Sequence, residues 1–117
     1  MQDFKVNILG SEWSVKFGNE EEYPNLKEMN GYTDSSTKEI IVDDMKASWG
    51  QTGSKADLES YQKQVVRHEI IHAFLTESGL ESCSNKAESW AINEEMVDWF
   101  AIQSPKIFKV FNELELM

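Results

Sequence analysis

Apolar and polar residues alternate in the first part of the chain, which is the pattern of half-buried β-strands. The alternation runs over residues 4–9 and again over 13–17, with Gly10 at the turn between them, and predicts a β-hairpin. A polar segment, residues 19–31, then leads toward a β-branched run at 38–43, which predicts a third strand. We therefore expect a three-stranded, mostly antiparallel sheet before any helix.

Helical spacing replaces the alternation from residue 57 to 78, where Gly79 provides a natural stop. Ser54 and Asp57 are both candidate N-caps for this helix. The apolar residues in its second half point in nearly all directions. That distribution predicts a central helix buried on every side.

Two more helices are expected in the C-terminal part of the chain. Asn85 followed by Glu88 resembles a capping arrangement and opens a helix to about Gln103. Its large apolar residues are expected to fill the remaining core: Met96, Trp99 and Phe100. Ser104 and Pro105 start a third helix, because proline suits the first helical position. The pattern thus predicts one α+β domain over residues 1–117, with the sheet packed on the central helix.

The central helix carries the sequence His-Glu-x-x-His, formed by His68, Glu69 and His72, and it contains both histidines of the chain. Residues four apart lie on one helical face, so the two imidazoles can hold one metal ion from the same side. Glu69 is turned about 100° from His68 and can lean over the metal without ligating it. A zinc hydrolase needs this arrangement of two ligands and a carboxylate beside an activated water.

A catalytic zinc ion usually keeps three protein ligands, so a third must come from outside the motif. Cys83 is one candidate, although a lone thiol more often packs as a small apolar group. Glu94 and Asp98 are four apart and share a helical face. That face also carries small residues that let two helices approach closely: Ala87, Ala91 and Ala101. We predict Glu94 as the third ligand, with Glu95 as its competitor, and Asp98 as the acceptor for a ligand histidine N–H.

The His-Glu-x-x-His motif and the later Glu-x-x-x-Asp pair, Glu94 and Asp98, resemble the gluzincin pattern. The chain is also similar to small ImmA/IrrE-type metallopeptidases and to minimal metallopeptidases of phages and prophages. In the ImmA/IrrE type a Glu-x-x-small-x-x-Phe-Ala segment follows the first motif, and Val97 stands here in place of the usual alanine. The resemblance covers residues 65–101 and implies a zincin-like fold and a peptidase that binds one Zn²⁺ ion.

The expected activity is hydrolysis of a peptide bond, with Glu69 as the general base and a peptide or protein as substrate. The strand at residues 39–42 is expected to pair with an extended substrate. Candidates for the donor that stabilises the oxyanion are Tyr61, Tyr32 and Arg67. The alternative is a catalytically silent, metal-stabilised protein-interaction module, which a fourth protein ligand would indicate.

The net charge of −10, from 21 acidic and 11 basic residues, narrows the range of partners. It opposes a nucleic-acid partner, which requires a basic face, and it opposes docking on an anionic membrane. A decoy that mimics nucleic acid is a further interpretation of the same charge. The single cysteine suits a reducing compartment, and the sequence shows no secretory signal and no membrane-spanning apolar stretch. We therefore expect a cytoplasmic protein.

Overall fold

The structure, a computed structural model, describes residues 1–51, 55–84 and 90–117. The strands are β1 Phe4–Ile8, β2 Ser11–Gly18, β3 Gly31–Asp34 and β4 Glu39–Asp43, and the long helices are α1 Leu58–Glu77 and α2 Glu94–Glu113. Two short 3₁₀ segments lie in the connections, at Pro24–Lys27 and Trp90–Ile92. This combination confirms the predicted α+β class. Within the described ranges, no helix is long and apolar enough to cross a membrane.

The four strands form one mixed sheet in the order β1-β2-β4-β3, in which only β2 and β4 pair in parallel. The prediction of three strands is therefore wrong in their number, and the sheet is mixed, with two antiparallel pairings and one parallel pairing. β3 has four residues of mixed polarity, all of them half-buried, so no alternation reveals it. β4 is buried without a break at Ile40, Ile41 and Val42, which is typical of a strand with a neighbour on each side.

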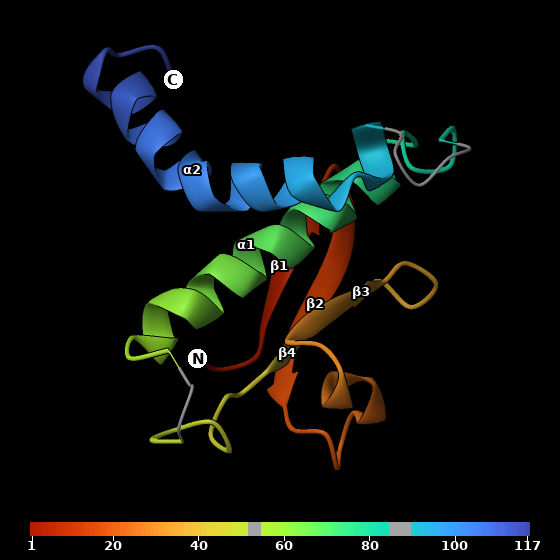
Figure 1. Cartoon of the computed structure of the whole chain (residues 1–117). Coiled ribbons are helices and arrows are strands. Elements are labelled where there is room, and N and C mark those ends of the chain that lie inside the picture. Colours follow the sequence, from red (N-terminus) through yellow and green to blue (C-terminus); the bar gives the residue numbers. More distant parts are fainter. Residues whose placement is uncertain (52–54, 85–89) are drawn as a thin grey trace.

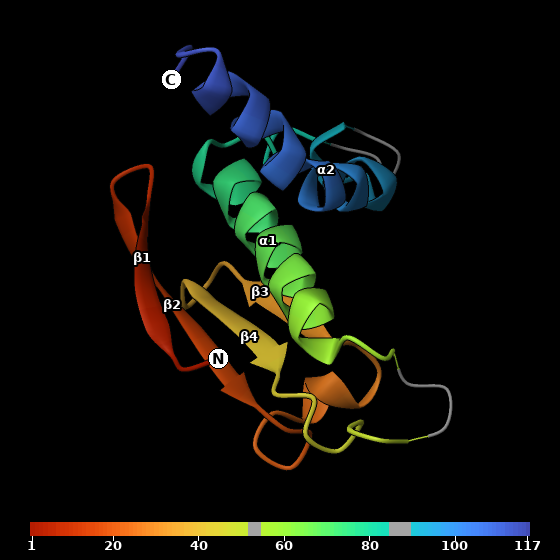
Figure 2. The ribbon, with the colours of Figure 1, turned by 90° about the vertical axis from the view of Figure 1, so that its left-hand side faces the viewer.

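The helix α1 packs on the sheet, and α2 packs on α1 (Figure 1). Figure 2 shows α1 between the sheet and α2. The main core lies at the contact of α1 with the sheet and consists of Ile8, Trp13, Val15, Ile40, Val42, Val66 and Ala73. On the other side of α1 the cover is incomplete, and Phe74 is 42% exposed. The expectation that this helix is buried on every side is therefore wrong.

Ordinary capping signals mark both ends of α1. The Asp57 carboxylate accepts a hydrogen bond from the Ser60 N–H at 3.0 Å and forms the N-cap. Ser54, the other candidate, lies outside the described residues. Gly79 follows the helix with a φ of +85°, a conformation that L side chains rarely adopt. The glycine thus ends α1 and turns the chain toward α2.

The C-terminal part forms one helix, α2, where the sequence predicts two. The Asn93 side-chain oxygen accepts from the Met96 N–H at 2.9 Å and caps the helix that begins at Glu94. The predicted cap at residues 85–88 lies outside the described residues. Pro105 does not open a new helix but lies inside α2, whose axis bends in its second half (Figure 1). The prediction of a third helix is therefore wrong.

Candidate metal centre

A cleft of about 480 Å³ opens between α1, β3 and the first turns of α2. From α1 it is lined by His68, Glu69 and His72, and from α2 by Glu94 and Asp98. His68 and His72 share one face of α1, and Glu94 and Asp98 share one face of α2, because each pair is four residues apart. The structure therefore brings all five predicted site residues to one cleft.

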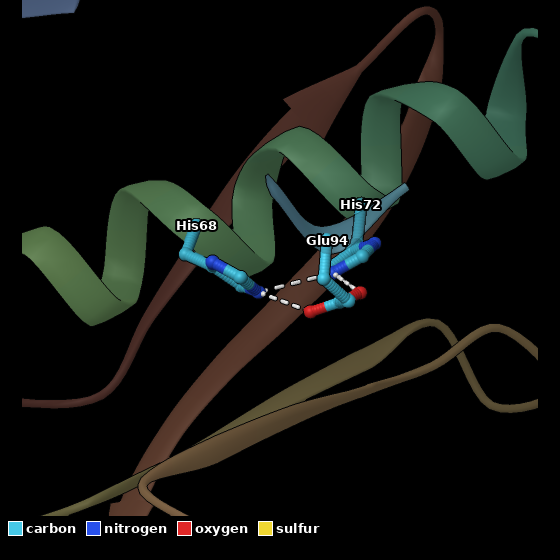
Figure 3. Close-up of side chains that lie close together, drawn as sticks. All are labelled: His68, His72 and Glu94. Carbon is cyan, nitrogen blue, oxygen red and sulfur yellow. Dashed lines mark hydrogen bonds and ion pairs between the residues drawn. The ribbon is translucent and has the colours of Figure 1, made fainter. Parts of the chain in front are cut away.

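Three of these side chains direct ligand atoms at a common point (Figure 3). The Nε2 atoms of His68 and His72 are 3.1 Å apart. Glu94 reaches both of them, with Oε2 at 3.2 Å from the His68 nitrogen and Oε1 at 2.9 Å from the His72 nitrogen. Among the described residues, this is the one group of three or more His, Cys, Asp or Glu side chains placed to share an ion.

The triangle formed by these donor atoms is close to the size that zinc requires. Nitrogen and oxygen ligands at about 2.0–2.1 Å in a tetrahedral site stand about 3.3–3.4 Å from one another. The two imidazole nitrogens are 3.1 Å apart, and they lie 2.9 and 3.2 Å from two different oxygens of the Glu94 carboxylate. With one ligand atom taken from each residue, all three atoms lie within 4.8 Å of one another, so small shifts of the side chains would bring them to this spacing. Two imidazole nitrogens and a carboxylate oxygen also form a known donor set for catalytic zinc. The residues present therefore fit a bound metal ion.

Asp98 orients the imidazole of His68. Its Oδ1 lies 2.6 Å from His68 Nδ1, and because a carboxylate can only accept, Nδ1 carries the proton of this pair. In this tautomer the lone pair of His68 Nε2 would be available to a metal ion bound between His68, His72 and Glu94. This is the contact that the sequence assigns to Asp98.

Glu69 lies beside the donor triangle without belonging to it. The residue is 5% exposed, and its Oε1 is 3.8 Å from His68 Nε2. Burial raises the pKa of Glu69 above its ordinary value, and the nearby imidazoles of His68 and His72 offset this only in part. The Thr33 hydroxyl lies 3.0 Å from Oε2 of Glu69 and 3.1 Å from its carbonyl oxygen. Glu69 is therefore a buried carboxyl group held in place from β3.

The competing third ligands, Cys83 and Glu95, do not belong to the donor group. Cys83 is a free, exposed cysteine, and Glu95 is exposed on α2. The side chains of Glu94 and Asp98 are themselves 65% and 58% exposed. The centre is thus enclosed on the side of α1 and open to solvent on the side of α2.

Small apolar residues of α2 and of the 3₁₀ segment before it lie at the contact with α1. Ala91 is 2% exposed and Val97 and Ala101 are fully buried, and the first two form a second apolar cluster with the C-terminal part of α1. Ala87 lies outside the described residues. Trp99 was expected in the core but is 56% exposed, because it lies on a different face of α2 from Val97.

Two of the three candidate oxyanion donors, Tyr61 and Tyr32, line the cleft. The Tyr61 hydroxyl oxygen accepts a hydrogen bond from Asn30 Nδ2 at 2.7 Å, which leaves the hydroxyl proton to donate elsewhere. Arg67 makes a different contact: its Nε donates to the Ala101 carbonyl of α2 at 2.6 Å. Its hydrogen bond thus joins the two helices.

Sequence reasoning missed the two residues of β3 that support Glu69, which are Gly31 and Thr33. A Cβ added at Gly31 would meet Val65 Cγ1 at 2.9 Å, Ile41 O at 3.1 Å and Glu69 Cγ at 3.4 Å. Glycine therefore lets β3 approach α1 closely enough for the Thr33 hydroxyl to reach Glu69. A glycine and a threonine in a short polar segment carry no periodic signal that would mark them as part of a site.

Comparison of the chain with protein-family models, with curated proteins and with solved structures found no match. An α+β fold by itself does not define a function, because one architecture hosts many activities. The functional argument therefore rests on the chemistry of the cleft.

Proposed function

We propose that the protein is a zinc-dependent metallopeptidase of the gluzincin type. His68, His72 and Glu94 hold one Zn²⁺ ion in this proposal, and Glu69 acts as the general base. The observation that carries it is the convergence of three ligand atoms beside a buried carboxyl group in an open cleft.

The number of ligands favours catalysis over a structural role. Structural zinc sites usually close with four protein ligands, whereas catalytic sites keep one position open. Within the described part of the chain, no fourth His, Cys, Asp or Glu joins the group. Two histidines and one carboxylate also suit non-haem iron, but the buried carboxyl of Glu69 next to the ligands is what a hydrolytic reaction needs.

Glu69 is the residue suited to move the proton. A bound zinc ion supplies Lewis-acid polarisation of the scissile carbonyl and activation of a water molecule. Glu69 Oε1, 3.8 Å from His68 Nε2, is near enough to take a proton from a nucleophile in the cleft. Glu69 is 5% exposed, and its buried position beside the ligands suits both this step and the transfer of the proton to the leaving nitrogen. The Thr33 hydroxyl holds the carboxyl group during both transfers.

Among the described residues no strand pairs with the outer edge of β3, so this edge can offer an extended substrate a partner strand. β4 lies between β2 and β3, so the expected pairing of substrate with residues 39–42 is wrong. The Asp43 N–H donates to the Asn30 carbonyl at 2.8 Å, and this register turns the backbone polar groups of Gly31 and Thr33 away from β4. A peptide paired with that edge would lie along the cleft beside the ligands, which supports a peptide or protein substrate.

Metal-dependent proteolysis by the purified chain tests this proposal. The zinc-loaded protein is incubated with a mixed peptide library, and new termini are counted by mass spectrometry. The wild type should cleave, and E69Q should keep its zinc while its activity falls by a factor on the order of 10²–10⁴. The matched control E95Q changes an exposed carboxylate outside the donor group and should bind zinc and cleave peptides like the wild type. Equal activity of E69Q and the wild type would refute the assigned base.

A catalytically silent, metal-stabilised protein-interaction module is the second candidate. It is favoured by the exposed apolar side chains of α2 and the C-terminal residues: Trp99, Ile102, Phe108, Phe111, Leu114 and Leu116. Zinc binding without cleavage of any peptide by the wild type would select this function over the peptidase. In both cases a cytoplasmic, reducing location suits the free, exposed thiol of Cys83.

A further inference from the structure

Pro105 leaves one carbonyl of α2 without its helical partner. In an α-helix the C=O of a residue accepts from the N–H four positions later, so the partner of Ala101 would be residue 105. Proline has no N–H to donate. Ala101 is fully buried, so water cannot readily replace the lost bond, and a buried carbonyl without a donor is destabilising.

Arg67 supplies the missing donor from the neighbouring helix. Its Nε lies 2.6 Å from the Ala101 carbonyl oxygen, and the positive charge makes this hydrogen bond stronger than one from a neutral N–H. Arg67 directly precedes His68 on α1, and Ala101 lies about two helical turns after Glu94 on α2. The bond therefore joins the two helices next to the metal centre.

The ligand Glu94 and its neighbour Asp98 depend on the position of α2, because packing of their own side chains does not hold them. The carboxylates of Glu94 and Asp98 are 65% and 58% exposed. A functional metal site requires its ligands within about 0.5 Å of the productive geometry. Any shift of α2 along or away from α1 would therefore displace Glu94 and Asp98 relative to His68 and His72.

We propose that Arg67 is a positioning residue of the metal centre. By donating to the buried carbonyl that Pro105 leaves open, it allows this part of α2 to stay against α1 and not move toward solvent, which keeps Glu94 and Asp98 opposite the two histidines. The inference deepens the proposed function and rests on it. It also predicts that replacement of Arg67 weakens metal binding only while residue 105 is proline.

A double-mutant cycle on zinc affinity tests this coupling, with R67M, P105A and the combined variant measured by competition with a chromophoric chelator. Methionine keeps an unbranched stem but offers no N–H, and alanine at position 105 restores the helical donor. R67M should weaken zinc binding on the order of tenfold. P105A should stay within about twofold of the wild type, and the combined variant should match P105A.

Two controls separate this role from a general loss of stability. K63M removes the cation one turn earlier on α1, which pairs with Glu59 on the same helix, and should bind zinc like the wild type. With Co²⁺ as a probe, the visible absorption of R67M should differ from that of the wild type, and the spectrum of the combined variant should return to it. Such a return requires restored ligand geometry and not merely restored folding.

The outcomes judge the proposed function and the role of Arg67 separately. A wild type without zinc affinity would overturn the proposed function and, with it, a metal-positioning role for Arg67. If the wild type binds zinc, unchanged affinity in R67M, or an equal loss with proline and with alanine at position 105, would overturn the role of Arg67 alone. If R67M does not fold, the combined variant is compared with P105A: equal affinities support the proposal, and a tenfold loss refutes it.

Discussion

Replacing Asp98 measures how far the metal centre depends on the orientation of His68. The 2.6 Å contact between Asp98 Oδ1 and His68 Nδ1 keeps the proton on Nδ1 and leaves Nε2 free for the metal. Loss of such a partner typically lowers metal affinity by about 10–100-fold. The Asp98 side chain is 58% exposed, so water replaces part of the contact. We therefore expect a loss at the lower end for D98A, about tenfold or about 1.4 kcal/mol of binding free energy.

The variant D98N separates the charge of this side chain from its geometry. Asparagine keeps an oxygen that accepts from His68 Nδ1, and a neutral acceptor makes a hydrogen bond about half as strong as a charged one. Zinc affinity should then fall by only about threefold. Competition with a chelator at neutral pH measures both variants, with E95A as the exposed control on the same helix. If D98A binds zinc as tightly as the wild type, Asp98 does not orient a ligand.

Two further predictions concern stability. In G31A the new Cβ would lie 2.9 Å from Val65 Cγ1, so the free energy of unfolding, measured with denaturant, should fall by about 1–3 kcal/mol. No loss would mean that β3 does not pack closely on α1. Hydrogen bonds from Lys38 and Trp13 lower the pKa of the Glu77 carboxyl group in the folded state. The ionised carboxylate therefore stabilises the folded protein at any pH above the unfolded-state pKa of Glu77. This stabilisation is lost as the pH falls through the folded-state pKa. The difference in unfolding free energy between the wild type and E77Q should therefore be larger near pH 7 than near pH 3, and equal differences would contradict this role of Glu77.

The spacing of residues within each helix was the most informative feature of the sequence. His68 and His72, like Glu94 and Asp98, are four residues apart, and each pair faces the same cleft. This geometry follows from the pitch of the helix and does not require knowledge of the rest of the chain. The candidate site could therefore be outlined before its surroundings were known.

Features that depend on distant segments could not be predicted in this way. β3 is short and polar, and its close approach to α1 depends on the absent side chain of Gly31. The parallel pairing of β2 with β4 could not be predicted either, because the periodicity of one strand does not indicate which strand lies beside it. Pro105 resembled a helix start because proline is favoured at the first helical position and removes a hydrogen bond inside a helix. The donor that compensates for it, Arg67, lies on another helix.

The zinc content of the purified chain, together with the identity of the ligands, is the most direct measurement of the central claim. The wild type and the variants E94A and E95A are loaded with Zn²⁺, dialysed and examined by elemental analysis and zinc X-ray absorption. We predict one tightly bound zinc ion per wild-type chain with two imidazole ligands and one carboxylate ligand, loss of most zinc in E94A, and full retention in E95A. A wild type that retains no zinc, or an E94A variant that binds it as tightly as the wild type, would contradict the proposed site.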